Sequence, residues 1–296
     1  MINKLKRFFT INYEGIASAR IINKYDNLSM SNQNTNIDKE LNENGFVNLG
    51  NCGFSVDVIS EKVKYIFDSK DNSESSIIAI KHPFLIDKDI SKFLSIDKVN
   101  ETIINYLGND ATFDRMWCYR VTTESSKSDV SGLWHHDRVG KRIKMFVLLH
   151  DIDESRRPLV YAKGSQKYKL TNNSYSKSRG NTDEMEKKFN NNITKLIGKK
   201  GDLVLIDTHG WHRASWEEGL YFRDVLSFEW SSYSKSVQLE KFNLPIGIKK
   251  ELFFSEFNPE NTLMKLGKLE VNGKYKIYGS KKNVLPVNTI DAIDFL

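Results

Sequence analysis

The chain has 296 residues, of which 39 % are hydrophobic and 11 % aromatic, and its formal net charge is +6. This length is sufficient to bury a core without covalent staples. The two cysteines, Cys52 and Cys118, cannot form a disulfide framework. No apolar run approaches the length needed to cross a membrane. We therefore expect a soluble globular protein of a reducing, cytoplasmic setting rather than a membrane or disulfide-rich secreted protein.

The positive charge is concentrated in one stretch. Residues 155–200 contain twelve Lys and Arg against three acidic residues, so the rest of the chain is slightly acidic. Within this stretch, residues 167–200 are polar and basic and predict a loop longer than compact domains usually contain. Two interpretations fit equally on charge alone: the loop attracts an anionic substrate, or it is a solvated loop that promotes solubility.

The N-terminal half of the chain predicts a polar extension followed by helices. Residues 1–37 are rich in Asn and Ser and predict an N-terminal extension. Residues 40–47 predict a helix that leads into a short strand. Helical spacing of apolar residues follows over 56–67, with Ser55 as a possible cap, and again over 90–107.

Beyond Met116 the pattern changes to short apolar runs separated by turns. The spacing of these runs, without long helices between them, favours antiparallel β structure. Two later runs, 249–254 and 275–278, fit a helix or an edge strand equally well. The expected strands are 115–121, 143–150, 158–162, 202–207 and 224–232.

His135 and Asp137 are a first pair of candidate metal ligands. Side chains two residues apart on a strand point to the same side, so this pair would present an imidazole nitrogen and a carboxylate oxygen together. A third ligand from another strand would complete one face of an octahedron and leave the opposite face open, as oxygen chemistry at Fe(II) requires. His136 should point away, into packing or a supporting hydrogen bond.

A second histidine cluster follows the apolar run after Gly201 and Asp202. Its two histidines, His209 and His212, are three residues apart, and either could supply the third ligand. We prefer His212, which stands eleven residues before Arg223, and keep His209 as the reserve candidate.

Arg223 opens an apolar strand. An arginine at the start of an apolar strand has two common roles. Its methylene groups can pack on apolar neighbours while the guanidinium reaches solvent, or its guanidinium can bind a carboxylate through two hydrogen bonds. A metal with open positions beside a buried arginine implies a ligand that chelates at one end and carries a carboxylate at the other. 2-Oxoglutarate is such a molecule.

Residues 40–233 resemble the phytanoyl-CoA dioxygenase family of Fe(II)/2-oxoglutarate oxygenases. The matching segments are 134–137, 144–149, 158–165 and 201–212, followed by Arg223. The resemblance implies a mainly β fold with flanking helices, the double-stranded β-helix or jelly roll. It also implies that His135, Asp137 and His212 bind Fe(II) and that Arg223 binds 2-oxoglutarate.

The chain departs from the family at two places near the implied site. Arg157-Pro158 stands where family members often have Gly-Pro, and Gln166 follows Gly-Ser where they often have His. The aspartate of the pair disfavours the related halogenases, which leave that coordination position to halide. Lys144, on the strand after the ligands, faces either the cosubstrate or solvent, because the alternation cannot be phased from the sequence.

The implied reaction is hydroxylation of a C–H bond with release of succinate and CO2. Fe(II), 2-oxoglutarate and O2 would be the cofactor and cosubstrates. The substrate would be a small, anionic metabolite, acyl conjugate or glycan precursor, covered by the basic loop 167–200; no nucleic-acid partner is expected. The oxygenase domain would span 38–243, and residues 244–296 would form a C-terminal extension packed on it.

Two other classes of function remain open. A cupin-like metal isomerase or dioxygenase would keep the jelly roll and the metal but would not need Arg223 as a carboxylate anchor. A non-catalytic glycan-binding jelly roll would need neither. Arg223 and the complete ligand set are the features that discriminate among the three classes.

Overall fold

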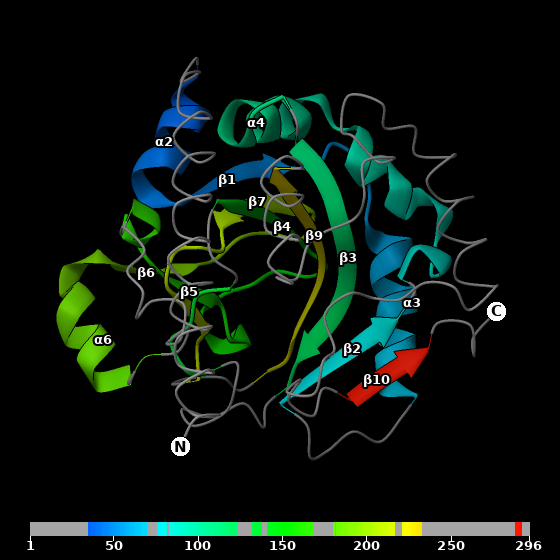
Figure 1. Ribbon diagram of the computed structural model, residues 1–296. Helices are drawn as coiled ribbons and strands as arrows, with labels where there is room; N and C mark the ends of the chain where they lie inside the picture. Colours follow the sequence, from blue (N-terminus) through cyan, green and yellow to red (C-terminus); the bar gives the residue numbers. More distant parts are fainter. Residues whose placement is uncertain are drawn as a thin grey trace, which may run out of the picture.

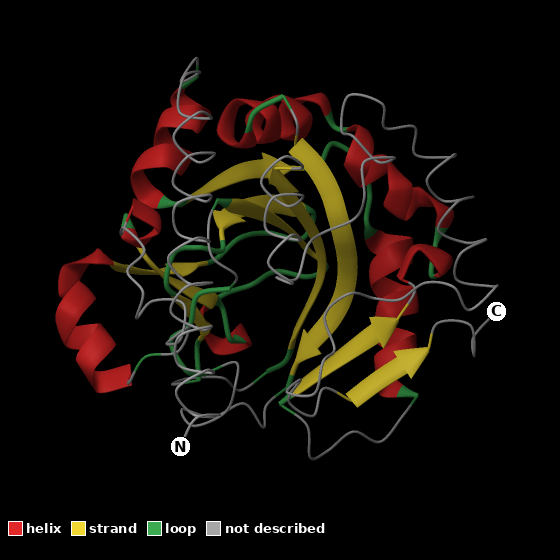
Figure 2. Cartoon of the chain, in the orientation of Figure 1, coloured by secondary structure: helices red, strands yellow, loops and turns green. Residues whose placement is uncertain are grey.

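Two β-sheets face one another in the computed structural model, which describes residues 35–69, 76–81, 83–109, 111–122, 132–137, 141–167, 180, 182–216, 221–232 and 288–291. The larger sheet curves around the smaller one, and helices cover its outer face (Figure 1, Figure 2). Its strands are β1 (Phe46–Asn51), β2 (Ile77–Lys81), β3 (Ala111–Val121), β4 (Arg142–Leu148), β7 (Asp202–Asp207), β9 (Arg223–Ser232) and β10 (Asn288–Asp291).

The larger sheet has the strand order β1-β7-β4-β9-β3-β2-β10. All its pairs are antiparallel except β10 with β2, which is parallel. The smaller sheet has the order β6-β5-β8 and is antiparallel. Its strands are β5 (Leu159–Ala162), β6 (Ile193–Leu196) and β8 (His212–Ala214).

The first described helix is capped at both ends by its local sequence. At the start of α2 (Asn36–Asn44), Thr35 and Asp38 exchange backbone-to-side-chain hydrogen bonds, and Gly45 ends the helix in the left-handed conformation. Ser55 Oγ accepts from the Asp57 amide at the start of α3 (Asp57–Asp68). The other helices are α4 (Asp97–Leu107), α6 (Thr182–Phe189), and the 3-10 turns η2 (Pro83–Leu85), η3 (Lys88–Ser95), η4 (Glu154–Arg156), η5 (Ser165–Lys167) and η6 (Asn190–Asn192).

The central strands β4, β7 and β9 of the larger sheet are buried on both faces, and strand alternation divides their side chains between two cores. On β4, Met145 and Val147 pack against α3, α4 and η3 in the main core, whereas Phe146 and Leu148 face the smaller sheet. The side chains of β7 are divided between the two cores in the same way. Burial on both faces explains why these strands read as mainly apolar runs in the sequence. The side chains of these strands that can reach a site between the sheets are those on the inner face.

The strands expected from the sequence are present with small shifts at their ends. They correspond to β3, β4, β5, β7 and β9. Strands β2, β6, β8 and β10 were not predicted; β6, β8 and β10 have only three or four residues each. The helix expected over 40–47 begins earlier, at Asn36, and the stretch 90–107 is divided into η3 and α4.

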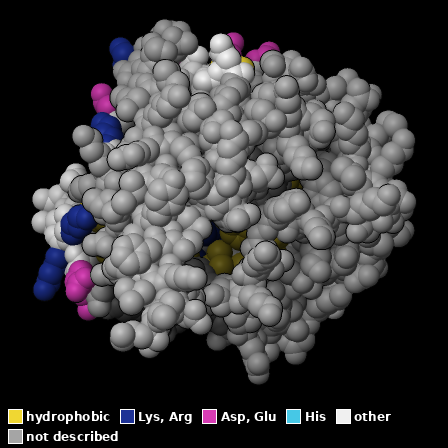
Figure 3. Space-filling model, viewed as in Figure 1, with side chains coloured by type: hydrophobic (Ala, Val, Ile, Leu, Met, Phe, Trp, Pro, Cys, Tyr) yellow, Lys and Arg dark blue, Asp and Glu magenta, His cyan; other side chains and the backbone are white. Residues whose placement is uncertain are grey.

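The basic segment 167–200 is not one long loop. It contains α6, η6 and β6, while residues 168–179 and 181 lie outside the described part. Exposed lysines on α6 are accompanied by acidic side chains, and Figure 3 shows both signs of charge at the edge of the molecule over this helix. The charge excess of the segment is therefore not carried by α6.

Some expectations fall on chain that is not described. Residues 249–254 and 275–278 are among them, as is almost all of the expected N-terminal extension. None of the described helices is both long enough and apolar enough to span a membrane.

Candidate metal centre

The segment that carries His135 and Asp137 is held to the turn before β8 by its backbone. The His135 amide donates to the His212 carbonyl (2.9 Å), and the His212 amide donates to the His135 carbonyl (2.8 Å). The Asp137 amide donates to the Thr208 carbonyl (2.9 Å). His135 and His212 form only an isolated β-bridge, and residues 136–137 belong to no strand. The expectation that the pair lies on a strand was therefore wrong. Backbone hydrogen bonds, rather than a continuous strand, position the two side chains.

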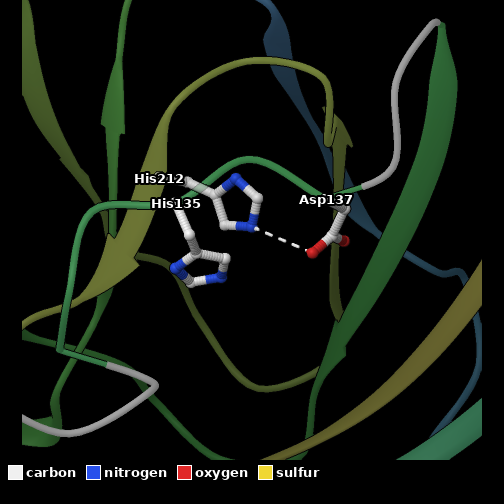
Figure 4. A group of neighbouring side chains, drawn as sticks. All are labelled: His135, Asp137 and His212. Atoms are coloured by element: carbon white, nitrogen blue, oxygen red, sulfur yellow. Dashed lines mark ion pairs between the residues drawn. The ribbon is translucent and has the colours of Figure 1, made fainter. Parts of the chain in front are cut away.

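His135, Asp137 and His212 converge on one point (Figure 4). One ligand atom from each residue lies within 4.8 Å of the others. His212 Nε2 is 4.0 Å from Asp137 Oδ1, and the two imidazole centroids are 4.4 Å apart. Two imidazole nitrogens and one carboxylate oxygen form the donor set of a facial triad.

Hydrogen bonds prepare both imidazoles to act as ligands. His135 Nδ1 is 2.8 Å from the Leu133 carbonyl, and His212 Nδ1 is 2.9 Å from the Gly210 carbonyl. A carbonyl can only accept, so each Nδ1 carries the proton and each Nε2 keeps its lone pair for a metal. Burial is the main cause that lowers the pKa of His212 to about 3, which keeps this ring neutral.

Lys144 holds the other oxygen of the Asp137 carboxylate. Its Nζ lies 2.9 Å from Asp137 Oδ2 and 3.3 Å from Glu229 Oε1. Glu229 also accepts from Arg142 (2.6 Å). Lys144 thus faces the interior and contacts the candidate ligand. One carboxylate oxygen is occupied by this pair, and Oδ1 is turned toward the two imidazoles.

The charges around Asp137 keep it ionised. Burial acts to raise the pKa of Asp137, but the charge of Lys144, the largest opposing influence, holds that pKa well below its ordinary value. Burial acts to lower the pKa of Lys144, whereas Asp137 and Glu229 raise it above its ordinary value. At neutral pH Lys144 is therefore an ammonium and Asp137 a carboxylate. The carboxylate is the form of Asp137 that binds a cation.

His209, the reserve candidate, lies apart from the triad. Its ring centroid is 5.9 Å from that of His136, and His136 in turn packs at right angles against Trp211, 5.0 Å between centroids. His136 is buried, as expected for a residue that points away from the pair. The geometry brings His212, and not His209, to His135 and Asp137.

Arg223 lies at the end of a small apolar pocket between the sheets. It is 6 % exposed. Among the described residues no carboxylate forms an ion pair with it, and its Nε has no hydrogen-bond partner. Burial, opposed by Tyr119 and helped by the charge of Arg157, lowers the pKa of Arg223 from its ordinary value. The remaining lining residues are Phe146, Leu148, Ile152, Leu159, Leu196, Val204 and Val225.

A buried guanidinium without an anion is costly, so this pocket has the chemistry to take one from a ligand. The apolar walls match a short methylene chain. The residues at hand thus fit both a divalent metal, at the triad, and a carboxylate, at Arg223.

The turn that precedes His212 is fixed by a buried carboxylate that the sequence interpretation missed. Asp207 accepts from Tyr106 Oη (2.6 Å) and from the His209 amide (2.8 Å), and its carbonyl accepts from Tyr161 Oη (2.7 Å). The Asp207 side chain is fully buried. These bonds hold residues 207–210 in place, and with them the direction in which His212 enters β8.

Gly210 is required in this turn by close approach. A Cβ at this position would overlap Tyr161 Oη and Cζ, and would lie 3.1 Å from Ser165 Oγ. We expect Gly210→Ala to cost about 3 kcal/mol, the upper range for overpacking, and to lower Tm by roughly 6–12 °C. Thermal unfolding followed by circular dichroism measures this.

Gly50→Ala is the matched control. Its backbone is left-handed (φ 70°), unlike that of Gly210, but a Cβ there meets nothing within 4 Å, so only backbone strain of about 1–2 kcal/mol is expected. Equal melting temperatures for the two variants would show that the overlap at Gly210 does not determine the stability.

No protein-family model matches the chain, and no curated protein matches its sequence significantly. Solved structures do match. One is the non-heme alpha ketoglutarate dependent epimerase SnoN from nogalamycin biosynthesis, in complex with Fe3+, alpha ketoglutarate and nogalamycin RO: 12 % identity, 67 % of this chain, 82 % of that chain, TM-score 0.52.

A second is EctD from S. alaskensis in its apoform: 16 % identity, 72 % of this chain, 80 % of that chain, TM-score 0.51. At such identities the likeness establishes the fold alone. The expected fold is confirmed: the chain is a mainly β protein with flanking helices, a jelly roll of the kind found in these iron- and 2-oxoglutarate-dependent proteins.

Proposed function

We propose that this chain is an Fe(II)- and 2-oxoglutarate-dependent oxygenase, similar to the phytanoyl-CoA dioxygenases, that hydroxylates a C–H bond of a small molecule. Succinate and CO2 would be released. The observation that carries the proposal is the pairing of a His-Asp-His cluster with a buried arginine that has no carboxylate partner among the described residues. The anionic character of the substrate rests on the charge of segment 167–200.

In this proposal His135 Nε2, His212 Nε2 and Asp137 Oδ1 hold the metal. Fe(II) bound there supplies activation of O2 coupled to oxidative decarboxylation of the cosubstrate. Lys144 keeps Asp137 monodentate by occupying Oδ2. A single carboxylate oxygen at the metal leaves positions open for the other ligands.

Arg223 binds the far carboxylate of 2-oxoglutarate, and the apolar walls of the pocket receive its methylene groups. Phe146 and Val225 exclude water from this ion pair, which strengthens it in the low-dielectric interior. A guanidinium at a fixed distance from the metal also selects a dicarboxylate over a simple 2-oxo acid.

The alternatives account for fewer of these features. A metal isomerase without a cosubstrate would use the triad but gives no reason to bury Arg223 unpaired. A glycan-binding module gives no reason for two histidines whose Nε2 lone pairs converge on a carboxylate. SnoN is described as an epimerase, so hydroxylation is the part of the proposal that only product analysis can test.

The test is anaerobic absorption spectroscopy of the Fe(II)-loaded protein before and after addition of 2-oxoglutarate. We expect a visible charge-transfer band that needs both components, followed by succinate formation when O2 is admitted. A protein that demonstrably holds Fe(II) but gives neither band nor succinate would contradict the proposal and favour the cupin-like alternative.

A further inference from the structure

Tyr119 lies on the face of the larger sheet that also carries Lys144 and Arg223. It stands on β3 opposite Val225 of β9, and cross-strand partners project from the same face of a sheet. Val225 lines the Arg223 pocket, as does Phe146, whose ring meets that of Tyr119 edge-on at 6.3 Å between centroids. The ring of Tyr119 therefore belongs to the interior face on which the cosubstrate would lie.

The charged groups of the site influence the hydroxyl of Tyr119. Burial raises the pKa of Tyr119, the charges of Lys144 and then Arg223 oppose that rise, and those of Asp137 and Glu229 add to it. The phenol remains neutral and is an O–H donor at neutral pH. Within the described part of the chain, no hydrogen bond of this hydroxyl is found.

The phenolic O–H of Tyr119 can donate a hydrogen bond, and an anionic ligand would supply the acceptor. Lys144 and Arg223 are themselves donors only and cannot accept the phenolic proton. The ring alone would pack against Phe146 equally well as phenylalanine. A hydroxyl without a hydrogen bond among the described residues, on the face that carries Lys144 and Arg223, suits a ligand that brings a carboxylate to that face.

We propose that Tyr119 is a further cosubstrate-binding residue, whose phenol donates a hydrogen bond to the dicarboxylate bound between the metal triad and Arg223. This inference rests on the proposed function. The residue was not among the candidates from the sequence, because the motif segments that carry the family resemblance begin only at residue 134.

The test compares Tyr119→Phe with Tyr65→Phe, in which the same atom is removed from a tyrosine that is 68 % exposed on α3. 2-Oxoglutarate is titrated anaerobically into each Fe(II)-loaded protein, followed by calorimetry and by the charge-transfer band. Separate titrations give the Kd of Fe(II), and thermal unfolding gives the Tm of each protein without ligand.

We expect Tyr119→Phe to raise the Kd of 2-oxoglutarate about tenfold to a hundredfold, the range for a hydrogen bond to a charged group. The Kd of Fe(II) and the Tm without ligand should stay at the wild-type values, and Tyr65→Phe should bind 2-oxoglutarate like the wild type. This pattern separates ligand binding from a merely structural role, which would also lower the Tm.

Two results would overturn the inference while the proposed function stands. One is an unchanged Kd of 2-oxoglutarate in Tyr119→Phe. The other is a parallel loss of Fe(II) affinity, which would mean that Tyr119 supports Lys144 and Asp137 instead. If wild-type protein with Fe(II) bound does not take up 2-oxoglutarate, the proposed function itself fails, and the inference with it.

Discussion

His212→Ala should weaken Fe(II) binding by at least about a hundredfold, because even residues that only orient a metal ligand are worth about 10- to 100-fold in affinity. His212 is one of three donors, and its Nε2 faces Asp137 Oδ1. With two donors left, the remaining imidazole and carboxylate cannot define one face of the coordination sphere. Oxygenase turnover should be lost as well.

His209→Ala is a closely matched control for this prediction. It removes the same side chain three residues earlier, in the same turn, from a histidine that packs against His136. We expect its Kd for Fe(II) to stay within about threefold of the wild type. Anaerobic titration with a competing chelator measures both constants. If the two variants lose affinity equally, or if only His209→Ala loses it, the assignment of His212 is wrong.

The second large effect is expected at Arg223. Arg223→Gln should raise the Kd of 2-oxoglutarate by about thirtyfold or more, since truncating one partner of a buried charged pair costs about 2–5 kcal/mol. Glutamine keeps part of the volume and a single donor amide but has no charge. Fe(II) affinity should be retained, because Arg223 is not among the triad. The charge-transfer band would then appear only at high cosubstrate concentration.

Arg156→Gln serves as the control for Arg223. This arginine lies in η4, with its guanidinium over the exposed ring of Tyr221 at 5.0 Å. It is partly exposed, so its replacement should leave the Kd of 2-oxoglutarate unchanged. Wild-type affinity in Arg223→Gln would show that the far carboxylate is held elsewhere, and would return the cupin-like alternative to first place.

The sequence predicts those parts of the fold that local physics determines. Strands such as β4 and β7 are mainly apolar because both of their faces are buried, and this pattern is visible without a structure. Short elements are different. β8 has three residues and owes its strand conformation to pairing with β5, so nothing in its own composition marks it.

The candidate site, too, was predicted only in part from the sequence. The choice between His209 and His212 stayed open in the sequence because both follow one apolar run, and the turn at Asp207 decides which of them reaches His135. The alternation along β4 could not be phased from the sequence. The register of β4 with β9 places Lys144 opposite Glu229, on the interior face.

Tyr119 and Asp207 were missed for a related reason. Each acts through partners that are distant in the sequence, as in the bond from Tyr106 to Asp207. Tyr119 lies in a predicted strand, but its face follows only from the pairing of β3 with β9. Pairing of this kind is a property of the whole chain and has no local signal.

The mutual amide-to-carbonyl bonds between His135 and His212 make the ligand cluster a reporter of complete folding. The two residues are far apart in the sequence, and loop closure of that length is entropically unfavourable until the sheets have formed around it. Partly folded chains should then hold iron poorly. Metal retention through a desalting column would measure the fraction of correctly folded protein in a preparation, without knowledge of the substrate.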